Sequence, residues 1–266
     1  MTMVQTLDTD LQRSAGAITL EVGVGGAVQR MREEGCAKLR TPARLTGQSP
    51  EAIIINTSGG LAGGDRFEVD VRAESDFCLT TQAAEKIYRS LGCETRVATR
   101  LRAEGNARLL WLPQEAILFN GAQLKRSFDA ELDRNATLLA VETVVLGRKA
   151  MGESLTEFSF HDHWRIRRNG KLIFSDDLRF DPMRVRGAAA LGGREAFATI
   201  VLAGRDTELF LEPLREIIGM SGGVSAWDGK LIARLVGADG FDLRKTLIPA
   251  LKLLSGKVQL PKVWTL

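Results

Sequence analysis

Regular alternation of apolar and polar residues, broken at short intervals by turn residues, restricts the fold of this chain more than any other feature. In the segment 66–72 (RFEVDVR), Phe67, Val69 and Val71 alternate with charged residues. Successive side chains of a β-strand point to opposite faces, so this period of two predicts a strand with one buried face. Residues 94–102 alternate similarly, and 27 glycines punctuate the chain. Many short strands separated by turns predict a mainly β fold.

Two β-hairpins are predicted from their turn residues. Asn169-Gly170 and Asp228-Gly229 each separate two short alternating runs. Asn-Gly and Asp-Gly readily adopt the positive φ angles of a type I′ turn, which joins antiparallel strands tightly. A further strand is expected over 137–146, whereas the segment 81–91 could form a short helix or an irregular turn.

Helical periodicity is confined to the C-terminal part, where two helices are expected near 206–218 and 242–255. Asp206 could cap the start of the first helix, and Gly219 its end. A proline inside a helix costs about 3 kcal/mol, so Pro213 should make the first turns irregular and Pro249 should kink the second helix. Gly256 should close that second helix.

Length and composition favour one β-rich domain. The 266 residues contain no low-complexity linker, and we expect a flexible tail over 1–14 followed by a single domain over 15–266. The net charge of +3 is spread along the chain, which argues against a nucleic-acid-binding surface. We find no signal peptide and no apolar run near the roughly 20 residues of a membrane span, so a cytoplasmic protein is expected. The three cysteines are too few for a disulfide scaffold.

A glycine-rich segment, 56–65 (NTSGGLAGGD), follows an apolar run and contains Gly59, Gly60, Gly63 and Gly64. Such a loop could cradle a phosphate, but here Asp65 and a strand follow where a phosphate-binding loop needs a lysine and a helix. A shaped strand-loop-strand crossing therefore explains the glycines better than a nucleotide site does.

No motif specifies a reaction, and two polar segments leave alternatives open. The polar and cationic groups at positions 80, 81, 86, 88 and 89 could line a channel or dock a partner, or they could form a solvated turn. His161 and His163 would share one face of a strand and could reach one metal ion, with Asp162 pointing away. Two histidines do not complete a metal site, so we expect a solvated loop that enters the hairpin.

Five segments occur in a fixed order: 56–65 (NTSGGLAGGD), 80–90 (TTQAAEKIYRS), 111–122 (WLPQEAILFNGA), 147–153 (GRKAMGE) and 260–264 (LPKVW). Together they resemble the UreD (UreH) family of urease accessory proteins over nearly the whole chain after about residue 15. This chain departs from the family at Thr57-Ser58, where two prolines are frequent, and at Asn120, where an acidic residue is usual. Neither departure removes a glycine or Asp65.

The resemblance implies a fold of stacked β-layers or a solenoid-like β-sheet domain with two C-terminal helices, and a function in urease maturation without catalysis. It implies a complex with the helical protein UreF and the GTPase UreG that loads nickel into urease apoprotein, through a polar tunnel. No cofactor would be tightly bound, and Ni(II) would pass only transiently. The tunnel residues that it implies are Asp65, Thr80, Thr81, Glu142 and Asp176. The residues that it implies for partner docking are Gly59, Gly60, Gly63, Gly64, Lys86, Tyr88, Arg89, Arg148 and Glu153.

Simpler roles remain open for several of these residues. Asp65 could only tie down the glycine loop, and Arg148 could simply pair with Glu153. The alternative function is a small-molecule enzyme that uses the glycine-rich loop and Asp65 as a base, in a pocket where the pKa of a carboxyl group is raised.

Overall fold

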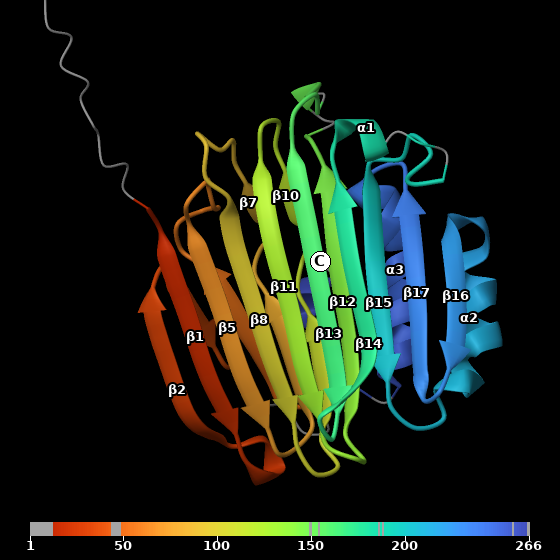
Figure 1. The fold of residues 1–266 in the computed structure, drawn as a ribbon. Coiled ribbons are helices and arrows are strands. Elements are labelled where there is room, and N and C mark those ends of the chain that lie inside the picture. The colour runs from red at the N-terminus through yellow and green to blue at the C-terminus, as the bar shows by residue number, and fades with distance from the viewer. Residues whose placement is uncertain are drawn as a thin grey trace, which may run out of the picture.

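Two β-sheets pack face to face, and helices cover the outer face of one of them (Figure 1). This computed structural model describes residues 13–43, 49–148, 151–153, 155–185, 187, 189–256 and 258–264. The seven-stranded sheet has the order β14 (Lys171–Phe180), β13 (Ser159–Arg168), β11 (Gln123–Leu132), β8 (Thr95–Ala103), β5 (Arg66–Ala73), β1 (Ala15–Val22) and β2 (Val28–Gly35).

The ten-stranded sheet lies partly behind it in Figure 1 and extends beyond it on the right, through β15, β17 and β16. Its order is β16 (Gly222–Trp227), β17 (Lys230–Gly237), β15 (Ala196–Ala203), β12 (Thr137–Leu146), β9 (Arg108–Leu112), β6 (Phe77–Thr81), β4 (Glu51–Asn56) and β3 (Ala37–Arg40), with β7 (Glu85–Ile87) and β10 (Ala116–Leu118) beside this path. The α-helices are α1 (Pro182–Val185), α2 (Leu211–Ile218) and α3 (Gly240–Ser255).

The chain winds between the two sheets. The long strands from β4 to β13 alternate between the ten-stranded and the seven-stranded sheet, and from β6 onward each pairs in parallel with the preceding long strand of its own sheet. Parallel neighbours need a crossover, and here the crossover is a strand of the opposite sheet. The predicted mainly β fold is confirmed, and its β-layers are stacked with a solenoid-like winding.

Alternation places the apolar side chains of each strand between the sheets. Phe67, Val69 and Val71 of β5 are buried, whereas its charged residues are exposed. Strand β12 is buried on both faces, because α2 and α3 pack on the back of the ten-stranded sheet. The strand expected over 137–146 is therefore confirmed, as a nearly continuous apolar segment.

Both hairpin predictions are confirmed. Asn169 and Gly170 have φ angles of 47° and 74°, and Asp228 and Gly229 have φ angles of 48° and 69°. These turns join β13 to β14 and β16 to β17.

The first predicted helix is correct in place but wrong at its start. Asp206 adopts a left-handed conformation and makes no side-chain cap. A 3-10 turn, Thr207–Phe210, precedes α2, and Pro213 is the third residue of α2, where its missing N–H group is not needed. Helix α3 begins at Gly240, two residues earlier than expected, because Asp239 caps it by accepting a hydrogen bond from Asp242 N. Pro249 lies inside this helix without ending it, and Gly256 follows it.

Two local expectations are wrong. Residues 81–91 include the strand β7 rather than a helix, and β7 pairs with β10. The segment His161–His163 is not a loop, because it lies within β13 between two hydrogen-bonded strands.

Residues 1–12 of the expected tail lie outside the described residues, which begin with Arg13 and Ser14, ahead of β1. All three cysteines are free. Among the residues that the structure describes, no helix is long and apolar enough to cross a membrane.

We predict that the helical layer contributes strongly to stability. Leu247 of α3 is fully buried against the ten-stranded sheet. Leu247→Ala should lower the free energy of unfolding by about 2–5 kcal/mol, because it removes buried methyl groups and leaves a cavity. Chemical denaturation measures this change, and Lys245→Ala on the exposed side of α3 is the control. Equal stability of the two variants would contradict the packing of α3.

Candidate functional site

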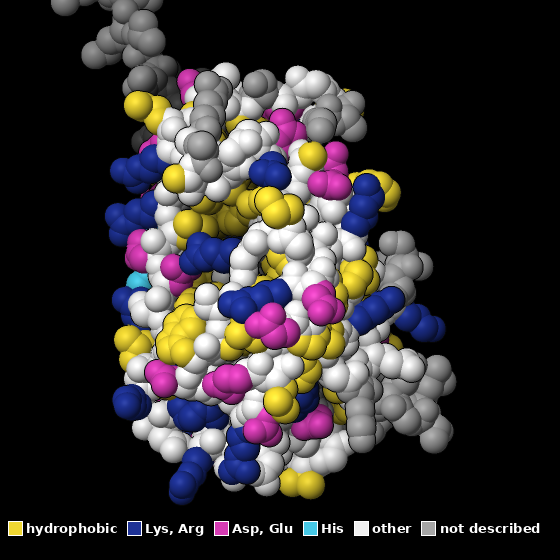
Figure 2. Space-filling view, turned by 90° about the vertical axis from the view of Figure 1, so that its right-hand side faces the viewer, with side chains coloured by type: hydrophobic (Ala, Val, Ile, Leu, Met, Phe, Trp, Pro, Cys, Tyr) yellow, Lys and Arg dark blue, Asp and Glu magenta, His cyan; other side chains and the backbone are white. Residues whose placement is uncertain are grey.

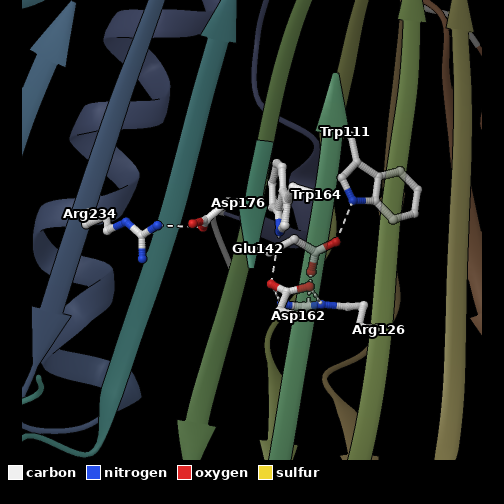
Figure 3. A network of polar contacts seen from close by, with 7 residues as sticks. All are labelled: Trp111, Arg126, Glu142, Asp162, Trp164, Asp176 and Arg234. Atoms are coloured by element: carbon white, nitrogen blue, oxygen red, sulfur yellow. Dashed lines mark hydrogen bonds and ion pairs between the residues drawn. The ribbon is translucent and has the colours of Figure 1, made fainter. Parts of the chain in front are cut away.

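A buried ionic network joins the two sheets, with Arg126 at its centre (Figure 3). Arg126 of β11 donates two hydrogen bonds to Asp162 of β13, from Nε to Oδ1 at 2.9 Å and from Nη2 to Oδ2 at 2.7 Å. Its Nη1 atom donates to Glu142 of β12, which belongs to the opposite sheet. The three residues are 5%, 6% and 3% exposed for Arg126, Glu142 and Asp162. A buried ion pair of this kind holds its partners in fixed positions.

Two tryptophans complete the network. Trp111 Nε1 donates to Glu142 Oε1 at 2.8 Å, and Trp164 Nε1 donates to Asp162 Oδ2 at 3.0 Å. With both carboxyl groups ionised, the three charged side chains carry a net charge of −1 between the sheets.

Burial changes the pKa values of the charged groups in this network. Burial raises the pKa of Glu142, and the positive charge of Arg126 offsets part of that rise. Burial alone would lower the pKa of Arg126, but the two carboxylates raise it overall, so the guanidinium remains charged. The geometry therefore keeps a cation and two acidic groups in a site that water scarcely reaches.

A cavity of about 70 Å³ lies beside the network, between the sheets. Its polar lining residues are Thr81, Glu85, Thr99, Gln114, Arg126 and Glu142. Gln114 is buried, and its Nε2 atom has no hydrogen-bond partner, while its Oε1 atom accepts from Arg244 of α3. The cavity thus presents carboxylate, hydroxyl and amide groups to any small polar species that enters it.

Glu85 is the second acidic group of this cavity. Burial raises its pKa to about 7, although Asn56 donates a hydrogen bond to Glu85 Oε1 at 3.0 Å and opposes the shift. Glu85 can therefore exchange a proton near neutral pH. A divalent cation would have to displace that proton, so coordination by Glu85 would be weak and would depend on pH.

The structure brings only some of the predicted tunnel residues to this cavity. Glu142 and Thr81 line it. The Thr80 hydroxyl group instead donates to Leu112 O at 2.7 Å, and Thr80 does not line the cavity. Asp176 of β14 forms an ion pair with Arg234 of β17, a second charged contact between the sheets (Figure 3).

Asp65 holds the glycine-rich loop. Its carboxylate accepts hydrogen bonds from Ser14 N and Ala62 N, both at 2.7 Å. Gly60 has a φ angle of +149°, and a Cβ atom there would lie 2.4 Å from the Tyr88 ring. The glycines therefore permit close contact with the segment around Tyr88, as expected for a shaped crossing.

Four of the five motifs meet at one end of the sandwich. Backbone bridges join Leu61 to Ile87 and Arg89 to Ala122, and Gly147 N donates to Leu118 O. Three further residues predicted to dock partners make contacts at this end, Lys86 through its backbone. Tyr88 OH donates to Gly59 O, Arg89 pairs with Glu157, and Lys86 O accepts from Leu61 N.

Arg148 pairs with Glu153, with Nε and Oε2 2.9 Å apart, as the simpler interpretation holds. The Arg148 guanidinium group also lies over the Phe119 ring, 4.2 Å from its centroid. The fifth motif is tied to the third, because Trp264 Nε1 donates to Leu112 O. Arg244 of α3 adds a second link, since its guanidinium group lies over the Trp264 ring and pairs with Glu115.

Sequence reasoning missed Arg126, Asp162, Glu85 and Gln114. One signal was present, because Arg126 and Asp162 occupy inward-facing positions of alternating strands, where an apolar residue is expected. Their pairing depends on the parallel register of β11 and β13, which local sequence does not encode.

We predict that Arg126 is required for stability. Arg126→Met leaves Glu142 and Asp162 buried without their cation, which should cost about 3–5 kcal/mol of unfolding free energy. The triple variant Arg126→Met, Glu142→Gln, Asp162→Asn should regain much of this loss in chemical denaturation. A loss below about 1 kcal/mol for Arg126→Met would contradict the buried network.

We predict a pH-dependent contribution from Glu85. Its pKa of about 7 in the folded protein exceeds the ordinary 4.5, so the folded state binds the proton more tightly than the unfolded state. Stability from this group is fully present below pH 4.5 and is lost as pH rises through 7, by about 3 kcal/mol. Denaturation at pH 5 and pH 8 should show a smaller pH dependence for Glu85→Gln than for the wild type. Glu216→Gln on the exposed side of α2 should behave as the wild type.

Comparison with known proteins identifies the family. A family model described as UreD urease accessory protein matches residues 5–265. The urease accessory protein UreD of Rhizobium leguminosarum bv. viciae is 48% identical over 245 residues, which cover 90% of this chain and 89% of that protein. UreD of Rhizobium etli is 47% identical, with both chains covered in full. UreD 1 of Brucella abortus is 46% identical over 248 residues, covering 90% of this chain and 88% of that protein.

These matches confirm the resemblance carried by the five motifs. They also identify an accessory protein of urease rather than a catalytic enzyme. The chain belongs to the UreD family of urease accessory proteins.

Proposed function

We propose that this protein acts in urease maturation as a scaffold and nickel conduit. In this proposal it assembles with UreF and the GTPase UreG, docks on urease apoprotein, and passes nickel through its interior. The observation that carries the proposal is the buried network of Arg126, Glu142 and Asp162 beside a cavity between the sheets, whose largely apolar lining includes a few polar side chains.

The chemistry of the cavity supports transfer better than storage. Glu85 and Glu142 provide carboxylate oxygens, and Thr81 provides a hydroxyl group. Ni(II) accepts oxygen ligands and water, but cysteine and histidine cages would bind it much more tightly. Neither histidine lines the cavity. A nickel ion would therefore be held transiently, as cargo rather than as a resident cofactor.

Exposed apolar side chains supply docking surface for protein partners. Leu209, Met220 and Phe241 are 75%, 95% and 75% exposed around the helical layer. Figure 2 shows hydrophobic side chains around a hollow in the upper half of one edge of the molecule. Exposed apolar groups gathered on one face typically mark a protein interface.

The enzyme alternative finds less support. Glu85 does have a raised pKa beside the cavity, but the base in that alternative is Asp65, which does not line the cavity. Both carboxylate oxygens of Asp65 accept backbone hydrogen bonds, from Ser14 N and Ala62 N. Family membership also assigns an accessory role.

Reconstitution tests the proposal directly. Urease structural subunits are expressed with the other accessory proteins, with and without this chain, and nickel content and urea hydrolysis are measured. We expect nickel-poor, inactive urease when the chain is missing, and full activation without it would overturn the maturation role.

The variant Glu142→Gln tests the conduit separately. It keeps the size of the side chain and an acceptor for Trp111 but removes a buried carboxylate. We expect urease nickel content to fall at least about tenfold, the effect typical of altering groups that tune a metal site. Asp70→Asn, which removes an exposed carboxylate of β5, is the control. Normal nickel loading by a folded, complex-forming Glu142→Gln protein would exclude this route.

A further inference from the structure

A second group of possible metal ligands lies outside the buried network, on the outer face of the seven-stranded sheet. His161 Nε2 lies 3.1 Å from Asp177 Oδ1, and His163 Nδ1 lies 2.9 Å from Asp177 Oδ2. One ligand atom from each residue lies within 4.8 Å of the others. Among the described residues, this is the one group of three or more histidine, cysteine or acidic side chains with such spacing.

The strand geometry explains why these three residues meet. His161 and His163 are two positions apart on β13 and share its outer face, whereas Asp162 between them points inward to Arg126. In the antiparallel register His163 is directly opposite Asp177 of β14. The β-ladder therefore fixes both imidazoles around one carboxylate.

We propose that His161, His163 and Asp177 bind a divalent first-row transition-metal cation of the nickel and zinc type. Two imidazole nitrogens and one carboxylate oxygen are a donor set that such cations prefer. The side chains of His161, His163 and Asp177 are 24%, 29% and 41% exposed, so water can complete the coordination.

The neighbouring cation Arg179 limits the affinity of this site for a metal ion. Its Nε atom lies 2.9 Å from Asp177 Oδ1, so a metal ion competes with a guanidinium group for that oxygen. The Arg179 side chain is 60% exposed and can turn toward water. In Figure 2 a histidine at the left edge lies close to both basic and acidic side chains. Arg179→Gln should therefore increase metal affinity.

The surface site does not depend on the proposed conduit. The two lie on opposite faces of β13, and a variant of one leaves the ligands of the other in place. Metal binding by the isolated full chain can therefore succeed or fail whatever the result of urease reconstitution.

Calorimetric titration of the full-length protein, purified without a histidine tag, tests the site with NiCl₂ and ZnCl₂ separately. We expect one binding equivalent whose affinity falls at least about tenfold in His163→Ala and in Asp177→Asn. Asp70→Asn removes an outward carboxylate of the same sheet and should bind as the wild type. If His163→Ala fails to fold by circular dichroism, His161→Gln replaces it.

Cobalt(II) absorption gives a second readout. Visible bands of cobalt bound to nitrogen and oxygen ligands should appear with the wild type and disappear with the same two variants. The absence of wild-type binding of nickel and zinc would overturn the proposal. So would unchanged affinity in both folded variants.

Discussion

The bidentate contact between Arg126 and Asp162, extended to Glu142, is the interaction on which the interior of this protein depends. Two carboxylates and a guanidinium group lie where both sheets bury them, so each group needs its partner. The network also connects the two sheets, because β11 and β13 belong to one sheet and β12 to the other. Burying three charged groups in a β-sandwich has a large desolvation cost, and their presence agrees with a functional role.

The layer of helices behind the ten-stranded sheet supports the buried ionic network. Helices α2 and α3 cover the back of the ten-stranded sheet, so the strand that carries Glu142 is apolar on its rear face except at Thr143. Only the face toward the seven-stranded sheet carries the charged network and the cavity. The solenoid-like winding then brings β9, β11, β12 and β13, which are consecutive long strands, to the same place.

The end of the sandwich where four of the five motifs meet is held together by other interactions than the buried ionic network is. It depends on glycine conformations and backbone bridges rather than on charge. Asp65 and the glycines of 56–65 hold the loop against the segment around Tyr88, and Arg148 and Glu153 close the neighbouring loop. These contacts give the motifs a structural role at this end of the sandwich. The proposed conduit therefore depends on other residues, which lie inside the sandwich.

Sequence by itself determined several of the strands, both hairpins, the approximate places of the two longer helices and the family, because these follow from alternation, turn residues and motif order. It placed His161 and His163 on a shared face if they lay in a strand, and placed Asp162 on the other face. It could not supply Asp177 or Arg126 as their partners. Those pairings join residues 14 to 36 positions apart through the register of neighbouring strands. Only the tertiary structure decided them, because register depends on how whole strands bury their apolar faces together.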